Sequence, residues 1–171
     1  MNGPAQQQGA VLIISLIVMV LLTSMGVAVM QGSVIEQKIA NNQRDMNTAM
    51  AAAELAMQAA EEAILDRQNP MLWSDFEADN GNPGLYAETP LGADEPWEQL
   101  STWSGNGSVV VNVSNTIYAQ PPRYIIERIG EFEVGPSMTD KQTIRMVRVT
   151  AIGYGTSSKS RVMLQANYRW N

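Results

Sequence analysis

The sequence feature that most constrains the fold is an uncharged apolar run near the N-terminus. Residues 10–30 read AVLIISLIVMVLLTSMGVAVM, and the chain has no Asp, Glu, Lys or Arg before Glu36. At about 1.5 Å per residue, a helix of this length reaches roughly 30 Å, the thickness of the hydrocarbon core of a bilayer. Such a segment has to lie in a membrane or against other apolar helices. The rest of the chain must therefore fold as a head carried by this anchor.

The helical pattern continues past the apolar run in an amphipathic form. Apolar residues recur mostly three or four positions apart, with Asn42 as an interruption, at Ile35, Ile39, Met46, Met50, Ala53, Met57, Ala60 and Ile64. This spacing places them on one helix face, and charged residues lie near the opposite face. Pro70, with Asn69 before it, ends the pattern, because proline cannot continue a helix and disfavours helix in the residue before it. We predict one helix to about Arg67 whose apolar stripe packs in the core of the head.

Two glycines, Gly26 and Gly32, lie in the first half of the predicted helix. Glycine costs about 1 kcal/mol in a helix interior, so its presence needs a reason. It marks either a close contact between small residues of neighbouring helices in a membrane, or a place where the helix bends or unwinds. The sequence does not decide between these two interpretations.

Composition excludes several classes of function. The formal net charge is -6 and the isoelectric point about 4.6, which argues against nucleic-acid binding, because a phosphate-binding surface must be positive. The chain contains neither cysteine nor histidine. It therefore has no disulfide and no thiolate metal site, and it lacks the commonest general base and metal ligand. We expect no catalytic residues, no cofactor and no metal, and we find no residues to name for an enzyme.

Residues 68–107 are predicted to form a long loop. They include four prolines and the turn-rich stretch DNGNPG at residues 79–84. Five aromatic residues punctuate the loop, namely Trp73, Phe76, Tyr86, Trp97 and Trp103. Aromatic side chains at this density indicate that the loop packs against something. They either close one end of the core of the head or form a contact surface for a partner subunit.

One acidic stretch within this loop resembles the start of a calcium-binding loop. Asp75, Glu77 and Asp79 alternate as in an EF-hand, but Asn80 stands where glycine is needed and Tyr86 where an acid is needed. We therefore interpret this stretch as a solvated acidic loop.

From Ser108 onward the pattern changes to period two. Val109, Val111 and Val113 alternate with polar residues and predict a first strand, and residues 123–134 and 142–154 predict two more. A turn at residues 155–159 precedes the clearest alternation in the chain, residues 160–170. Four strands joined in sequence indicate an antiparallel meander. The predicted fold class is α+β, with the long N-terminal helix packed on a four-stranded antiparallel sheet.

These segments resemble a known family. Gly9 followed by the apolar run looks like the class III signal of type IV pilins, which prepilin peptidase cuts after the glycine. The stretch EQKIANNQRDMNTAMAAAE at residues 36–54 resembles the PilX-type minor pilins, as do PPRYIIERIG at 121–130 and RVTAIGYGTSSKSRVMLQANY at 148–168. The resemblance covers both ends of the chain and misses the middle loop. It implies a pilin-like fold and a role in assembling a fibre.

The resemblance also implies a division of the chain. Residues 1–9 are a cleaved leader, residues 10–35 the transmembrane and fibre-packing half of the helix, and residues 36–171 the periplasmic head. Gly9 and Ala10 flank the cut. Candidate packing positions in assembly are Ile14, Gly26, Gly32, Met46, Met50 and Met57. The implied partners are prepilin peptidase, other minor pilins, the major pilin, the inner-membrane assembly platform and a tip adhesin.

The sequence departs from the pilin pattern at two places. Major pilins carry a glutamate at the fifth residue after the cut, where this chain has Ile14. That glutamate is thought to neutralise the terminal amine of a neighbouring subunit, since a bare charge in an apolar environment is costly. A subunit without it suits the tip of a fibre better than its shaft. The leader also lacks basic residues, so the inside orientation of the N-terminus is only weakly encoded.

Three other functions are weighed against a minor pilin of the type IV pilus. A pseudopilin of a type II secretion system also has a long helix and can lack the glutamate, although the strand pattern argues against it. A fibre-displayed adhesin would use the aromatic loop as a binding surface. An enzyme held by a signal anchor would retain residues 1–9.

Overall fold

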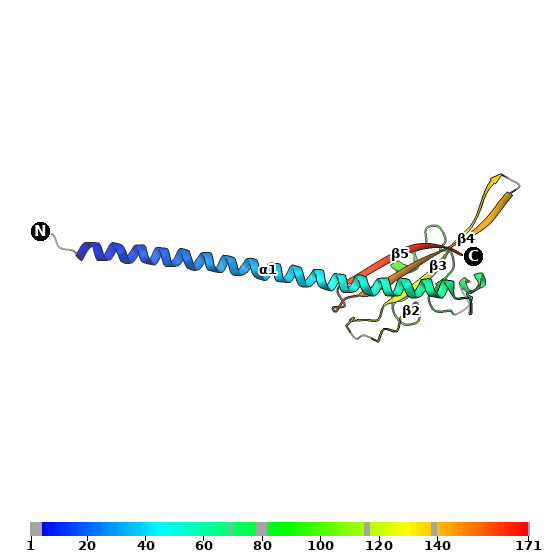
Figure 1. Ribbon diagram of the computed structural model, residues 1–171, viewed down its shortest axis with the longest axis horizontal. Helices are drawn as coiled ribbons and strands as arrows, with labels where there is room; N and C mark the ends of the chain where they lie inside the picture. Colours follow the sequence, from blue (N-terminus) through cyan, green and yellow to red (C-terminus); the bar gives the residue numbers. More distant parts are fainter. Residues whose placement is uncertain (1–4, 69, 78–81, 115–116, 138–139, 171) are drawn as a thin grey trace. The chain divides into compact units, whose positions relative to one another are not determined.

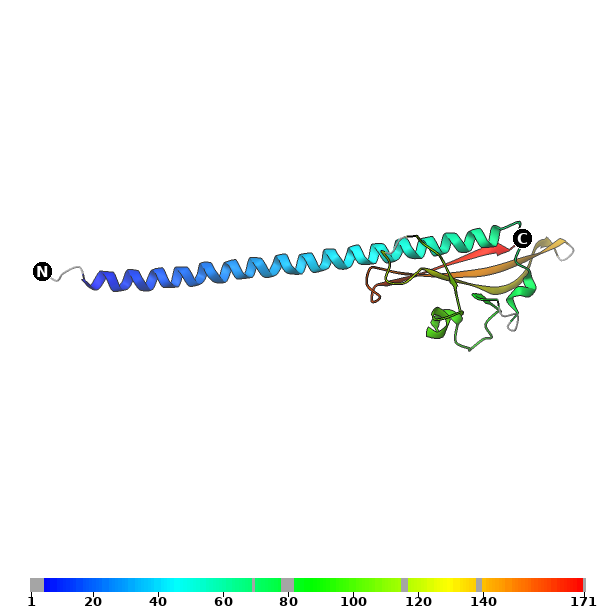
Figure 2. The same ribbon diagram turned by 90° about the horizontal axis from the view of Figure 1, so that it is seen from below.

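The computed structural model describes residues 5–68, 70–77, 82–114, 117–137 and 140–170. Its elements, shown in Figures 1 and 2, are helix α1 (Ala5–Leu65), 3-10 helices η1 (Trp73–Phe76), η2 (Pro96–Glu98) and η3 (Leu100–Trp103), and strands β1 (Leu85–Tyr86), β2 (Val109–Val110), β3 (Arg123–Ser137), β4 (Asp140–Tyr154) and β5 (Arg161–Trp170). The predicted α+β class, with a long N-terminal helix packed on a mostly antiparallel sheet, is confirmed. The chain divides into two units at Gln43, and we describe each by itself.

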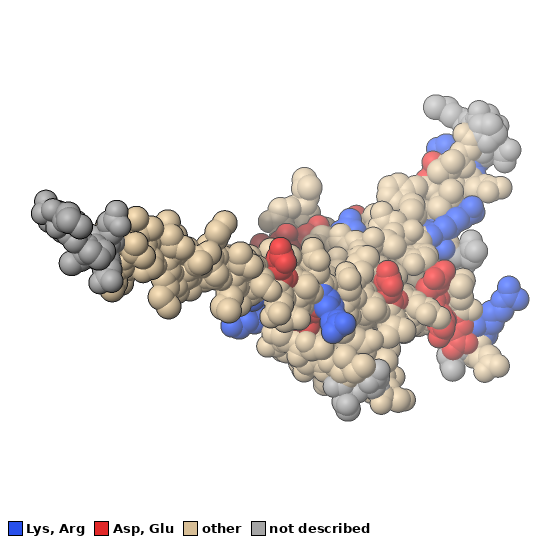
Figure 3. All heavy atoms as spheres, turned by 60° about the vertical axis from the view of Figure 1, so that its left-hand side comes forward, with Lys and Arg blue, Asp and Glu red and all other residues tan. Residues whose placement is uncertain are grey.

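The first unit consists of the N-terminal part of α1. By its length and composition this helix could cross a membrane. Its residues from Gly9 onward are exposed. The hydroxyls of Ser15, Thr23 and Ser24 are satisfied within the helix, since they donate to backbone oxygens three or four residues earlier at 2.6–2.9 Å. The part of this helix before Glu36 contains no charged residue, and the stretch of helix nearest the N-terminus is tan in Figure 3. These properties fit a membrane anchor.

The second unit, the head, is built on a sheet with the order β1-β3-β4-β5. Strands β3, β4 and β5 form the predicted antiparallel meander. The sheet has five strands and not the predicted four. The additional strand is β1, which lies in the segment predicted as a loop and pairs in parallel with Ile126 and Glu127 of β3. The predicted first strand is also much shorter than its pattern, since β2 contains only Val109 and Val110. One further hydrogen bond follows β2, from the N–H of Val111 to the oxygen of Pro122 at 2.9 Å, and Pro121 and Pro122 have no N–H to donate in return.

Beyond the end of β5, strands β3 and β4 continue as a two-stranded arm (Figure 1). Two ion pairs lie on one face of the arm, Glu131–Arg145 at 2.7 Å and Glu133–Lys141 at 2.6 Å. Phe132 is about half exposed on the arm. The arm is therefore held by cross-strand pairs and not by the core.

The last five turns of α1 cover one face of the sheet (Figure 2). Their buried residues are alanines, at Ala49, Ala52, Ala53, Ala56 and Ala60, each fully buried. The predicted stripe is partly wrong, because Met46 is 52% and Met50 39% exposed, whereas Met57 is half-buried against the core. The predicted helix end is close to the observed Leu65, while Asn69 of the predicted stop lies outside the described residues.

The reason for alanine in these positions is the close approach of the helix to β4. A Cβ placed on Gly153 would overlap the backbone nitrogen of Ala53 and the backbone oxygen of Ala49, and would lie 2.7 Å from the backbone carbon of Ala52. The backbone of α1 therefore rests directly on the backbone of β4. Larger side chains on this face of α1 would hold the two elements apart.

The opposite face of the sheet is covered by the segment that was predicted as loop. Trp103 is buried against Ile125 of β3 and Ile152 and Tyr154 of β4, and Tyr86 and Trp97 pack onto the same cluster. The sheet is thus enclosed on two sides, by α1 and by residues 86–103.

The contact at Gly153 yields a first prediction. Gly153→Ala should lower the free energy of unfolding of the head by about 1–3 kcal/mol, because the added methyl group meets backbone atoms that cannot rotate away. Urea unfolding of the detergent-solubilised chain, followed by tryptophan fluorescence, measures the effect. Gly32→Ala is the matched control, since a Cβ there meets nothing within 4 Å. Equal midpoints for the two variants would contradict the contact.

Candidate functional site

A polar contact fastens α1 to the turn between β4 and β5. The Oδ1 atom of Asp45 accepts hydrogen bonds from the backbone N–H of Thr156 (2.6 Å), from the hydroxyl of Thr156 (2.6 Å) and from the backbone N–H of Ser157 (3.3 Å). Gly155 makes room for this, because a Cβ there would lie 2.7 Å from the backbone oxygen of Asp45. One carboxylate on the helix therefore organises a turn more than a hundred residues later in the chain.

The charge on Asp45 is favoured by these donors. Hydrogen bonds from the hydroxyls of Ser160 and Thr156, in that order of importance, hold the pKa of the Asp45 carboxyl below its ordinary value. The two backbone N–H groups act in the same direction, and the small desolvation of the group opposes them. The carboxylate is therefore ionised whenever the head is at neutral pH.

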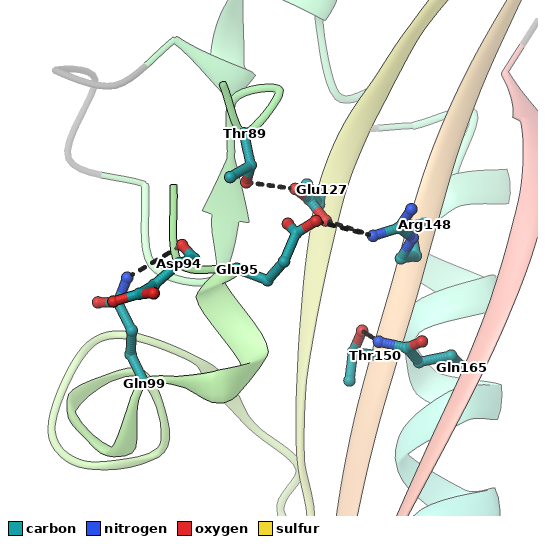
Figure 4. A network of polar contacts seen from close by, with 8 residues as sticks. All are labelled: Thr89, Asp94, Glu95, Gln99, Glu127, Arg148, Thr150 and Gln165. Carbon is teal, nitrogen blue, oxygen red and sulfur yellow. Dashed lines mark hydrogen bonds and ion pairs between the residues drawn. The ribbon is translucent and has the colours of Figure 1, made fainter. Parts of the chain in front are cut away.

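A second polar cluster joins the 86–103 segment to the sheet (Figure 4). Glu127 of β3 is only 4% exposed, and its Oε1 atom accepts a hydrogen bond from the hydroxyl of Thr89 at 2.7 Å. Arg148 of β4 lies 3.5 Å from Glu127 Oε2 and 3.9 Å from Glu95 Oε1. Its guanidinium group also stacks over the ring of Trp97, 4.5 Å from the centroid. The cluster thus connects two strands with the segment that covers them.

This cluster holds two carboxyl groups and one arginine. Burial raises the pKa of the Glu127 carboxyl above its ordinary value, and the nearby Glu95 carboxyl raises it further, while Thr89 and Arg148 act in the opposite direction. The raised pKa means that ionised Glu127 costs stability at neutral pH and that the cost is relieved as the pH falls. One oxygen of Glu95 is buried without a hydrogen-bond partner among the described atoms. The cluster therefore positions the segment at an electrostatic cost.

The structure brings the five predicted aromatic residues together in two groups. Trp73 and Phe76 pack with Trp170, with ring centroids 5.6–6.4 Å apart, and close the helix-covered face beyond the end of α1. Tyr86, Trp97 and Trp103 pack on the opposite face. Phe76 is fully buried and Trp103 is 7% exposed. The aromatics therefore fill the core, and the exposed apolar residues of this segment are Leu72, Leu91 and Leu100.

The predicted N-terminal positions all lie on α1. Gly9 and Ala10 belong to the helix, Ile14 is 61% exposed, and a Cβ on Gly26 or Gly32 would meet nothing within 4 Å. Residues 1–4 of the predicted leader lie outside the described residues. Among the described residues nothing lies within 4 Å of a Cβ on either glycine, so these positions are open to contacts with other molecules.

The structure describes only part of the acidic stretch of the loop, including Asp75 and Glu77. Asp75 uses its carboxylate to accept a hydrogen bond from the N–H of Leu72 at 2.7 Å, and Asp79 and Asn80 lie outside the described residues. Within the part of the chain that the structure describes, no group of three or more His, Cys, Asp or Glu side chains could hold a metal ion.

Reasoning from the sequence missed the residues that organise the head. Asp45 and Glu127 were read as members of motifs and not as structural groups, and Gly153 was read as part of a strand. A signal was available, since Asp45 ends the EQKIANNQRD motif and Gly155 and Thr156 begin the GTSS turn. The motifs that carry the resemblance are the places where distant segments meet.

Comparison with known proteins identifies a family. Residues 37–170 match the family model described as type IV pilus assembly protein PilX C-term, and residues 8–58 match PilX N-terminal. Together the two models extend from residue 8 to residue 170. No curated protein and no solved structure matches the chain.

The Asp45 contact yields a second prediction. Asp45→Asn keeps an acceptor oxygen but loses the charge, so it should lower the melting temperature of the head at neutral pH. The wild-type advantage is complete above the ordinary aspartate pKa of about 4 and is lost as the pH falls through the lower pKa of the folded state. Thermal unfolding of both proteins between pH 7 and pH 3 measures this.

The control for Asp45→Asn is Glu54→Gln, which neutralises an exposed acid on the same helix. Its difference from the wild type should be small at every pH. A difference between Asp45→Asn and the wild type that stays constant down to pH 3 would show that the charge of Asp45 does not contribute.

Proposed function

The chain belongs to the PilX family of type IV pilus assembly proteins, and on that basis we propose that it is a minor pilin that helps to prime the fibre and lies at or near its tip. The observation that carries the proposal is the uncharged N-terminal part of α1, which has Ile14 in place of an acid and no charge before Glu36. The 21 residues after Gly9 are uncharged, and the helix is long and apolar enough to cross a membrane. Family membership favours the pilus over a type II secretion system.

The proposed pathway begins in the membrane. The apolar segment of 10–35 holds the protein in the inner membrane with the head in the periplasm, and prepilin peptidase removes residues 1–9 after Gly9. Ala10 then becomes a methylated N-terminus. The exposed helix surface supports this pathway, because the large apolar side chains from Val11 to Val34 are 48–73% exposed and could contact lipid or neighbouring helices.

Placement at the tip follows from charge. In a stack of pilins the positive terminal amine of each subunit lies in an apolar environment, where an unpaired charge is costly. A subunit that joins an existing stack offers its carboxylate to the amine of the subunit before it, and a subunit with Ile14 has no carboxylate to offer. The first subunit has no predecessor to neutralise, and the carboxylate of the next subunit can neutralise its amine. A subunit with Ile14 therefore begins a fibre more readily than it extends one.

The proposed partners are the components that a starting complex requires. They are other minor pilins, the major pilin, the inner-membrane assembly platform and a tip adhesin. Met46, Met50 and the exposed side of Leu55 offer these partners an apolar surface on the part of α1 that belongs to the head. The aromatic residues give no support to a separate adhesin function, since Phe76 and Trp103 are buried in the core.

The processing step yields a third prediction. Mass spectrometry of the protein from sheared pili should find Ala10 as a methylated N-terminus and no peptide containing residues 1–9. Replacing Gly9 by a bulky residue, as in Gly9→Leu, should leave the leader attached and prevent incorporation into pili. A mature protein that begins at Met1 would contradict the proposal and favour a signal-anchored protein.

The tip placement yields a fourth prediction. In wild-type pili the protein should be far less abundant than the major pilin, and Ile14→Glu should raise its share by several-fold, because the new carboxylate can neutralise a neighbour's amine. Quantitative mass spectrometry of purified fibres gives the ratio. Ile14→Gln, which adds a polar group without charge, is the control. A high wild-type share that Ile14→Glu leaves unchanged would place the protein in the shaft.

A further inference from the structure

The two edges of the sheet differ in whether another strand covers them. The edge of β3 is occupied by two short strands, because β2 pairs with Tyr124 and Arg123 and β1 pairs with the two residues after Ile125. At the other edge, β5 pairs with β4 and with no other strand among the described residues. A ten-residue strand therefore presents a row of backbone groups on its outer side.

The hydrogen-bond pattern shows which residues present these groups. The N–H of Gly155 in the β4–β5 turn donates to the oxygen of Ser160, and on β3 the N–H of Ile126 points away from β4 to the oxygen of Gly84. Backbone groups alternate in direction along a strand, so these two bonds fix the direction throughout the antiparallel ladder. The even-numbered residues of β5 bond to β4. The odd-numbered residues, Met163, Gln165 and Asn167 among them, turn their N–H and C=O groups to the free edge.

The backbone of this edge is regular. Residues 161–170 contain no proline and no glycine, and their register with β4 has no bulge. The side chains of the even-numbered residues face the core. Met163, Gln165 and Asn167 are exposed. Strand β5 is therefore regular, and the backbone groups on its outer side are available for pairing with another strand.

The residues near this edge carry mainly positive charge. The last 31 residues hold six lysine or arginine residues and no acid, although the whole chain has a net charge of -6. Three of the six cations are paired with acids on β3, at Arg145, Arg148 and Lys141. Lys159, Arg161 and Arg169, at the two ends of β5, have no acidic partner among the described residues. The free edge is thus flanked by uncompensated positive charge.

We propose that the free edge of β5 binds an extended, acidic segment of another subunit of the pilus assembly, which adds a strand to the sheet. The backbone groups of the odd-numbered residues supply the hydrogen bonds, and Arg161, Arg169 and Lys159 select a partner strand that carries Asp or Glu. This inference rests on the proposed function, since the partner is another component of the same assembly.

Charge also excludes a second copy of this chain as the occupant. Two β5 edges paired antiparallel about a twofold axis, with Gln165 at the centre, would bring Arg161 of each copy opposite Arg169 of the other. Like charges directly opposite each other on paired strands are destabilising. The edge is therefore suited to a different chain.

Amide hydrogen exchange tests the proposal directly. The full chain in detergent is measured alone and after addition of the purified major pilin and each purified minor pilin of the same pilus, one at a time. With the true partner, the amides of Met163, Gln165 and Asn167 should become protected, and the neighbouring even-numbered amides, already bonded to β4, should change little. Binding should weaken as salt is raised. Protection of this chain alone with rising concentration would overturn the proposal in favour of a second copy, and binding without protection of these amides would place the contact elsewhere.

A single substitution separates backbone pairing from side-chain effects. Asn167→Pro removes an N–H that faces the free edge and leaves the β4–β5 ladder intact, so it should weaken partner binding at least tenfold. Asn167→Ala removes the side chain and keeps the N–H, so it should bind as the wild type does. Thermal unfolding checks that Asn167→Pro is folded. Should it not fold, the paired variant Arg161→Glu with Arg169→Glu tests the charge selection, with the same expected loss.

Complementation of a deletion strain distinguishes a failure of the proposed function from a failure of the strand-addition inference. If the deletion strain makes normal pili, the proposed function fails. If it lacks pili, the wild type and Asn167→Ala should restore them and Asn167→Pro should not. Full restoration by folded Asn167→Pro would overturn the strand-addition inference and leave the proposed function standing.

Discussion

The head depends on one contact, the direct apposition of the α1 backbone and the β4 backbone at Gly153. No side chain separates the two elements there, and the alanines that surround the contact are fully buried. The hydrogen bonds of Asp45 lie one turn or two earlier on the same helix and hold the neighbouring turn in place. A helix seated so closely cannot slide along the sheet without meeting a Cβ, so the register between helix and sheet is fixed.

The same helix has to satisfy two surroundings. Its N-terminal part carries no charge before Glu36, and the hydroxyls of Ser15, Thr23 and Ser24 donate hydrogen bonds to the backbone of the helix, as an apolar environment favours. Its C-terminal part uses small residues toward the sheet and charged residues toward solvent. This division lets one continuous element serve as an anchor and as half of a soluble core. The large apolar side chains of the anchor are exposed, as contact with lipid or with other helices requires.

Much of this fold could be predicted from the sequence. The long helix, the three main strands and the turn after Tyr154 follow from hydrophobic period and turn residues. Strand β1 could not be predicted, because two residues carry no period. Ala53 and Ala60 were in the predicted stripe and are buried, but Ala49, Ala52 and Ala56 were missed because large apolar residues such as Met46 dominate a hydrophobic stripe. The role of Asp45 depends on a turn more than a hundred residues away, and no local pattern shows such a contact.

The central claim is that this PilX-family chain begins a fibre and does not extend one. Gold labelling of intact pili with antibodies against the head tests it most directly. The account predicts label at one end of each fibre, with none along the length. Regular label along the shaft would contradict it.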